Sequence, residues 1–168
     1  MKELFSKTEF QIEPITPEHL DEIQTADSEK LVRDKTLKAF ANIQKPLFVE
    51  HTYLKINVIN GFPGGLTSSF WETLGGKLIC KYFSKSRVTA ETIICFCNAK
   101  NISTFRGHID GTISSKPQGK SEFQWDTIFI PKSFKKTFAQ MTSKQKNEIS
   151  MRKKAVEDFI KHLEKIYE

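Results

Sequence analysis

Apolar residues recur at helical spacing in two stretches, one near each end of the chain. In the first, Asp27 can accept the hydrogen bonds of a helix N-terminus, and one face follows it: Val32, Thr36, Ala39, Phe40 and Ile43. In the second, a helical region begins at Thr142 or Ser143, and a longer stripe runs to the end: Ala155, Val156, Phe159, Ile160, Leu163 and Ile166. The pattern predicts helices over residues 27–43 and 150–167.

The middle of the chain is rich in β-branched and aromatic residues, separated by segments with turn chemistry. Extended structure is predicted over residues 46–59, 88–100, 102–107, 108–114 and 123–131. A short helix is predicted over residues 66–74, after a Gly/Pro-rich turn, and residues 114–122 form a polar loop. Because helices and strands alternate over one core, the class is α/β or α+β with a single mixed sheet.

Length and composition indicate one globular domain covering residues 1–168. A chain of 168 residues with 38% hydrophobic content can bury a core without a metal or a disulfide. It holds no apolar run of 18 residues, which excludes a transmembrane helix and argues against a membrane partner. The first ten residues lack the apolar segment of a secretory signal, so we expect a cytoplasmic protein. The odd number of cysteines, Cys80, Cys95 and Cys97, indicates reduced packing residues.

The net charge of +6 changes this picture only slightly. The basic residues are scattered among acids, and short clusters occur only at residues 132–136 and 152–154. A solvated surface explains this distribution, and so does a site for a small, highly anionic ligand such as a nucleotide. Binding to duplex nucleic acid is not expected.

Polar residues occupy unusual positions at three places. The common phosphate-loop and zinc-helix motifs, GxxxxGK(S/T), GxGxxG and HExxH, are absent. Instead, polar or aromatic residues follow an apolar strand, interrupt an aromatic strand, or lie at a helix junction: Glu50, His51, Thr52, Trp125, Asp126, Lys146, Ser150 and Arg152. Each also has an ordinary explanation, as a solvated strand end, an edge tryptophan with a capping aspartate, and a charged helix junction.

These segments resemble the inosine triphosphate pyrophosphatase family. FQWDTIFIP, KTFAQM and KNEISMRKKA are similar to its F-G-W-D-P-x-F-x-P, T-(F/Y)-A-E-M and E-K-N-x-(I/V)-S-H-R. PLFVEHTYL resembles V-E-D-(S/T)-(G/C)-L, NGFPG resembles G-G-x-P-G, and STFRGHIDGTIS resembles F-x-G-x-x-x-G-x-I. The tripeptide EIQ, Glu22 to Gln24, also recurs in the family. The resemblance spans nearly the whole chain in the family's order.

The resemblance implies a two-lobed α/β fold, with a long twisted mixed sheet flanked by helices and a nucleotide cleft between the lobes. It also implies a homodimer that hydrolyses ITP, dITP or XTP to the monophosphate and pyrophosphate. The metal it implies is Mg²⁺, with Mn²⁺ as an alternative. The match gives catalytic roles to Glu29, Lys35 and His51, and metal-binding roles to Glu29 and Glu50. The residues matched to substrate binding are Thr52, Phe123, Trp125, Asp126, Lys146, Ser150 and Arg152.

The chain departs from the family pattern at functional positions. It begins after the family's first strand and its phosphate-binding (S/T)-x-N-x-x-K turn. His51 stands at the metal-binding Asp, Met151 stands at the His of S-H-R, and Gln124 and Thr127 replace the Gly and Pro beside Trp-Asp. The spacing from Glu29 to Lys35 is also one residue longer than usual.

These departures leave three hypotheses open. The first is an active pyrophosphatase, which in-frame codons for the missing segment upstream of Met1 would favour. The second is a catalytically degenerate nucleotide-binding module. The third is an interaction protein whose exposed sheet edge recruits another chain. His51 has three interpretations of its own. It acts as a general base, it replaces a metal ligand in a site that no longer binds the metal, or it is a structural histidine at a strand end, hydrogen-bonded to a backbone carbonyl.

Overall fold

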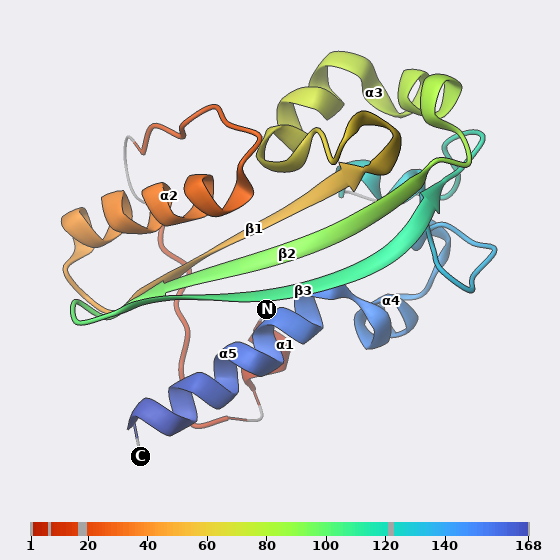
Figure 1. Cartoon of the computed structure of the whole chain (residues 1–168). Helices are drawn as coiled ribbons and strands as arrows, with labels where there is room; N and C mark the ends of the chain where they lie inside the picture. The colour runs from red at the N-terminus through yellow and green to blue at the C-terminus, as the bar shows by residue number, and fades with distance from the viewer. Residues whose placement is uncertain (1, 7, 17–19, 121–122, 168) are drawn as a thin grey trace.

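A computed structural model describes residues 2–6, 8–16, 20–120 and 123–167. Its sheet has the order β1-β2-β3-β4, with β1 at Leu47–Ile56, β2 at Arg87–Cys97, β3 at Ile102–Ile113 and β4 at Phe129–Pro131 (Figure 1). The expected α/β class and the single sheet are confirmed. The expected mixture of parallel and antiparallel pairs is wrong for the described strands, because all three pairings are antiparallel. Residues 121–122 of the predicted polar loop lie outside the described residues.

The first three strands are long and twisted, and they run the length of the molecule (Figure 1). The sequence predicts two strands over 102–114, but β3 is continuous through Gly107. A Cβ at Gly107 would lie 1.9 Å from the Met151 carbonyl oxygen, so this glycine lets a helix approach the strand closely. The glycine is therefore a packing site and not a strand end.

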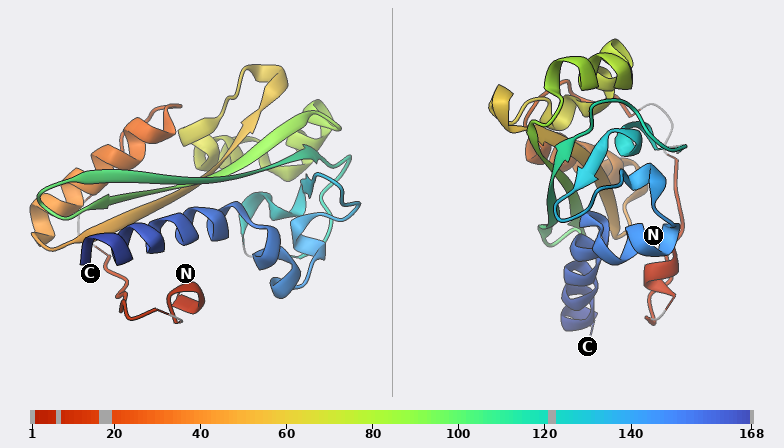
Figure 2. Two further views of the ribbon diagram at one scale, coloured as in Figure 1. Left: turned by 60° about the horizontal axis from the view of Figure 1, so that its bottom comes forward. Right: turned by 90° about the vertical axis from the view of Figure 1, so that its right-hand side faces the viewer.

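The two predicted amphipathic helices cover opposite faces of the sheet (Figure 2). Helix α2, Ser28–Ile43, begins at Asp27, whose carboxylate accepts the backbone N–H groups of Glu29 and Lys30 at 3.0 Å. Helix α5, Met151–Tyr167, packs on the other face, and the short helix α1, Lys2–Phe5, lies beside it. Both predictions are confirmed to within one residue at each end.

Alternation along the strands separates the cores beneath these helices. Tyr53, Ile93 and Cys95 form a core with Val32 on the α2 face. Their neighbours in the chain, including Ile94 and Phe96, pack on the α5 face: the buried members there are Phe5, Ile94, Phe96, Ala155, Val156, Phe159 and Leu163. All three cysteines are buried and free, as expected.

The far end of the sheet carries a third core, built from α3 and the segment after β3. Helix α3, Thr67–Phe83, extends beyond the predicted 66–74 because the chain continues past a break at Gly75, where φ is +65°. The segment after β3 contains β4 and the short helix α4, Ser143–Ile149. It also contains 3-10 turns at Gln124–Thr127 and Phe138–Gln140. Within the described chain, no helix is long and apolar enough to cross a membrane.

The prediction of a strand over 123–131 is wrong for most of that range. Gln124–Thr127 is a 3-10 turn closed by the Ile128 N–H donating to the Trp125 carbonyl at 3.0 Å, and only Phe129–Pro131 is a strand. In a strand, Trp125 and Asp126 would point to opposite faces. The turn instead buries both, with 1% and 2% of their surfaces exposed.

Candidate active site

The residues predicted for the site lie on two sides of strand β1. Because side chains alternate along a strand, Glu50 and Thr52 point toward α5, whereas His51 points toward α2. Glu29 lies on the α2 side too, since it pairs with Arg106, the cross-strand neighbour of Ile93 on that face. The sequence assigned Glu29 and Glu50 to one metal, but the structure places these carboxylates on opposite faces.

On the α5 side, Phe123 meets two cations. The Lys146 ammonium forms an ion pair with Asp126 and lies 5.2 Å from the centroid of the Phe123 ring. The Arg152 guanidinium carbon lies 5.9 Å from the same centroid. Three motifs that are separate in sequence therefore supply one cluster containing an aromatic ring, a buried carboxylate and two cations.

Arg152 is oriented by β1. Its Nε donates to Glu50 Oε1 at 2.7 Å, and the Thr52 hydroxyl donates to the same oxygen at 2.9 Å. Thr52 also shares a hydrogen bond of 2.8 Å with Thr92 on β2. The Glu50 side chain is 20% exposed, so this carboxylate both anchors Arg152 and remains in contact with solvent.

Two predicted substrate-binding residues lie behind this cluster. Trp125 is 1% exposed and contacts Phe123 edge-on, with centroids 5.2 Å apart. Ser150 is 7% exposed, and its hydroxyl accepts the Lys153 N–H at 3.2 Å at the start of α5. Of the two aromatic residues matched to substrate binding, Phe123 is partly exposed, and Trp125 supports it from the core.

On the α2 side, His51 lies in a charged surrounding. Lys35 Nζ pairs with Glu22 Oε2 at 2.7 Å. Burial lowers the pKa of His51 below its usual value and Lys35 lowers it further, while Glu22, Glu50 and a hydrogen bond with the backbone of Gly65 oppose the shift. The His51 Nε2 atom is buried and has no hydrogen-bond partner among the described residues.

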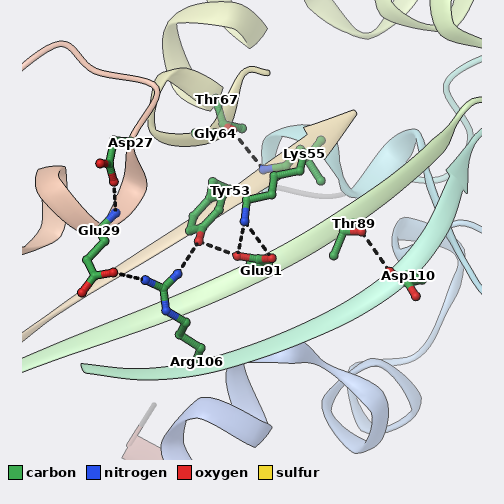
Figure 3. A network of polar contacts seen from close by, with 11 residues as sticks. Asp27, Glu29, Tyr53, Lys55, Gly64, Thr67, Thr89, Glu91, Arg106 and Asp110 are labelled. Carbon is green, nitrogen blue, oxygen red and sulfur yellow. Dashed lines mark hydrogen bonds and ion pairs between the residues drawn. The ribbon is translucent and has the colours of Figure 1, made fainter. Parts of the chain in front are cut away.

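Sequence analysis gave no role to Glu22. The similarity of its tripeptide EIQ to the family was the signal that could have identified it, but the metal-binding role went to Glu29. Figure 3 shows Glu29 engaged elsewhere: its carboxylate accepts Arg106 Nη2 at 2.5 Å within a network that continues to Tyr53. The structure therefore brings Glu22, and not Glu29, to Lys35 and His51.

The available carboxylates allow a test of whether a divalent cation fits here. In the part of the chain that is described, no three or more histidine, cysteine or acidic residues gather as a ready metal site. Mg²⁺ usually binds one or two carboxylates and completes its shell with phosphate oxygens and water. Glu22 lies beside Lys35 on the α2 side, whereas Glu50 points to Arg152 on the α5 side, so a magnesium ion here would have Glu22 as its carboxylate and take its other ligands from the substrate and water.

A surface hollow of about 500 Å³ lies away from these residues. It occupies the end of the sheet, where its lining includes Arg87, Asp110, Lys132 and Phe134. None of the predicted site residues contributes to this lining. The candidate active site is therefore an open arrangement around β1 and not this hollow.

The fold and the site together define an α/β protein with helices on both faces of an antiparallel sheet and a cation-rich, carboxylate-bearing cluster around its first strand. The chain belongs to the Ham1 family, whose family model matches residues 1–162. A relative from Saccharolobus solfataricus named dITP/XTP pyrophosphatase is 32% identical, over 98% of this chain and 86% of its own. The inosine triphosphate pyrophosphatase of Yarrowia lipolytica is 34% identical, over 85% and 79%.

Solved structures agree on the fold. A HAM1 protein from Coxiella burnetii superposes with a TM-score of 0.80 at 21% identity, covering 98% of this chain and 91% of that one. The Staphylococcus aureus Ham1 protein gives a TM-score of 0.70 at 22% identity, over 86% and 81%. The long sheet flanked by helices is thus the architecture of Ham1 proteins.

Proposed function

We propose that this chain is a nucleoside triphosphate pyrophosphatase that hydrolyses ITP, dITP or XTP to the monophosphate and pyrophosphate. The observation that carries the proposal is the cluster of Phe123, Lys146 and Arg152, in a chain whose relatives are named for this reaction. An aromatic ring beside fixed cations suits a ligand with a flat base and several negative charges.

The α5 side is proposed to recognise the base. Phe123 provides a surface for the purine, and Trp125, Asp126 and Ser150 hold the elements that present it. Arg152 can only donate hydrogen bonds, so it suits the 6-oxo group of hypoxanthine or xanthine and not the 6-amino group of adenine. Glu50 and Thr52 keep Arg152 in place.

The α2 side is proposed to handle the phosphates. Lys35 supplies positive charge there, and Glu22 beside it would hold Mg²⁺, or Mn²⁺, in the role that the resemblance gave to Glu29. When bound, the metal neutralises charge on the phosphate oxygens and on the departing pyrophosphate. The neutral imidazole of His51 accepts a proton from the attacking water.

The resemblance to the family further implies a cytoplasmic homodimer. Light scattering coupled to size exclusion tests this part, because a monomer mass of 19.4 kDa would contradict it.

The central experiment is a pyrophosphate-release assay over ITP, XTP, dUTP and ATP, with Mg²⁺ and with Mn²⁺. We expect release from ITP and XTP well above release from ATP. The matched control is Lys161→Ala on the exposed side of α5, which should behave like wild type. Binding of ITP without hydrolysis would contradict the enzyme and support a degenerate nucleotide-binding module.

A further inference from the structure

Two residues of β1 depart from the resembled motif V-E-D-(S/T)-(G/C)-L. His51 stands at the Asp, and Tyr53, a large residue, stands at the small Gly or Cys. Both side chains point to the α2 face, because they are two residues apart on β1. Their rings stack, with centroids 5.6 Å apart and planes at 21°. The two departures are therefore in direct contact.

The Tyr53 ring is fixed at its outer end. Its side chain is fully buried, and its hydroxyl donates to Glu91 Oε2 at 2.5 Å (Figure 3). Lys55 Nζ lies 3.0 Å from both oxygens of Glu91, which holds that carboxylate in turn. Arg106 Nη1 donates to the Tyr53 hydroxyl at 3.4 Å from the next strand. The phenol is thus held from two neighbouring strands.

The ring is also fixed along its sides. Val32 of α2 and Ile93 and Cys95 of β2 pack around it. Arg106, which contacts the hydroxyl, continues to Glu29 in the first turn of α2. A ring enclosed in this way cannot turn without breaking contacts to both the sheet and the helix.

We propose that Tyr53 is a positioning residue for His51, holding the imidazole in one orientation beside Lys35 and Glu22. The stacked ring restricts rotation of the imidazole and adds to its hydrogen bond with the backbone of Gly65, since the Nε2 atom makes no hydrogen bond among the described residues. This inference rests on the proposed function, in which His51 receives a proton from water. It adds a residue that acts through His51 and does not touch the substrate.

The test is Tyr53→Phe, which keeps the ring and removes the hydrogen bonds to Glu91 and Arg106. We expect kcat for ITP to fall about tenfold, because displacing a reacting group by about 1 Å costs up to roughly a hundredfold. KM should stay within about twofold, since Phe123, Lys146 and Arg152 lie on the other side of β1. The matched control is Tyr82→Phe on α3, a tyrosine 64% exposed, which should change neither constant.

A second pair of variants separates positioning from packing. Glu91→Gln keeps an oxygen that can accept the Tyr53 hydroxyl, so it should retain most of the wild-type kcat. Glu91→Leu removes that acceptor and should reproduce the loss seen in Tyr53→Phe. Equal activity in the two Glu91 variants would overturn the proposal.

A direct measurement does not depend on catalysis. The imidazole protons of His51, assigned by comparison with His51→Gln, should be shifted upfield by the Tyr53 ring in wild type. They should move toward the values of a free histidine in Tyr53→Leu, which removes the ring, and should change less in Tyr53→Phe, which keeps it. Unchanged shifts together with unchanged kcat would show that Tyr53 only fills space. If wild type hydrolysed no triphosphate, the proposed function would fail, while the shifts would still report whether Tyr53 orients the imidazole.

Discussion

At the scale of single residues, the charged groups of the site differ in how strongly the fold depends on them. Asp126 is almost fully buried beside Lys146, whereas the pair of Lys161 and Asp158 lies in solvent, with side chains 74% and 59% exposed. A buried carboxylate needs its cation far more than an exposed one does, because water no longer stabilises the charge. Lys146 is therefore expected to serve both stability and substrate binding.

Lys146→Ala should lower the free energy of unfolding by about 2 kcal/mol, less than for a fully buried pair because Lys146 is partly exposed. The exposed control Lys161→Ala should change it by less than about 0.5 kcal/mol. Chemical denaturation of the two variants and wild type measures both. Equal effects would mean that the Asp126 pair contributes no more than a surface pair.

His51 gives a prediction on pH and stability. Burial lowers the pKa of His51 below 6.5 in the folded protein, so the unfolded chain binds the proton more readily. The folded state is then favoured above pH 6.5, and this contribution is lost as the pH falls from there through the lowered pKa. We expect the free energy of unfolding to fall more steeply from pH 7 to 5 in wild type than in His51→Gln. Parallel curves would contradict this.

At the scale of elements, amphipathic pattern was a good guide where one face of an element is buried. Helices α2 and α5 follow their predicted ranges closely, because each buries one face and exposes the other. Strand β1 is found where it was predicted but ends at Ile56, three residues early. The pattern failed at 123–131, where aromatic residues typical of a strand enter the core from a 3-10 turn. The strand propensity of these aromatic residues predicted the wrong element, because their packing into the core determines the backbone conformation there.

Close approach of elements was also hidden from the pattern. Gly107 lies at the contact of β3 with the start of α5, next to Arg152, and a side chain there would meet backbone atoms. Gly75 is different: it has a φ of +65° and a ψ of 166°, a conformation that favours glycine, but the space around it is open. The two glycines therefore separate the cost of crowding from the cost of backbone strain.

Gly107→Ala should lower the free energy of unfolding by about 3 kcal/mol and reduce activity, because α5 must move away from the sheet and carry Arg152 with it. Gly75→Ala should cost about 2 kcal/mol, from backbone strain alone, and leave KM for ITP unchanged. Thermal unfolding and ITP hydrolysis measure both. A stable and active Gly107→Ala protein would show that α5 adjusts without loss.

At the scale of the whole molecule, the site is divided by the sheet, and this division explains what the sequence could and could not predict. Phe123, Asp126, Lys146 and Arg152 lie in one cluster in the structure, and their motifs follow one another in the C-terminal third of the chain. Alternation along a strand puts the neighbours Glu50 and His51 on opposite faces, but their motif could not show which partners each of them meets. Those partners depend on which helix covers each face, which only the packing reveals.

The same division predicts that the two halves of the site can be altered independently. Arg152→Gln removes the guanidinium from the base side, so the preference for ITP over ATP should fall at least tenfold, since a site built for a hydrogen bond rejects a substrate that lacks it. Lys35→Met on the α2 side should lower kcat/KM for both nucleotides by the same factor. Because the two residues lie on opposite faces and share no partner, their effects on kcat/KM should add in the double variant to within about 0.5 kcal/mol. The test is to measure kcat/KM for ITP and ATP in wild type, the two single variants and the double variant. A strong coupling between the two substitutions would mean that base and phosphate recognition are not separated by β1.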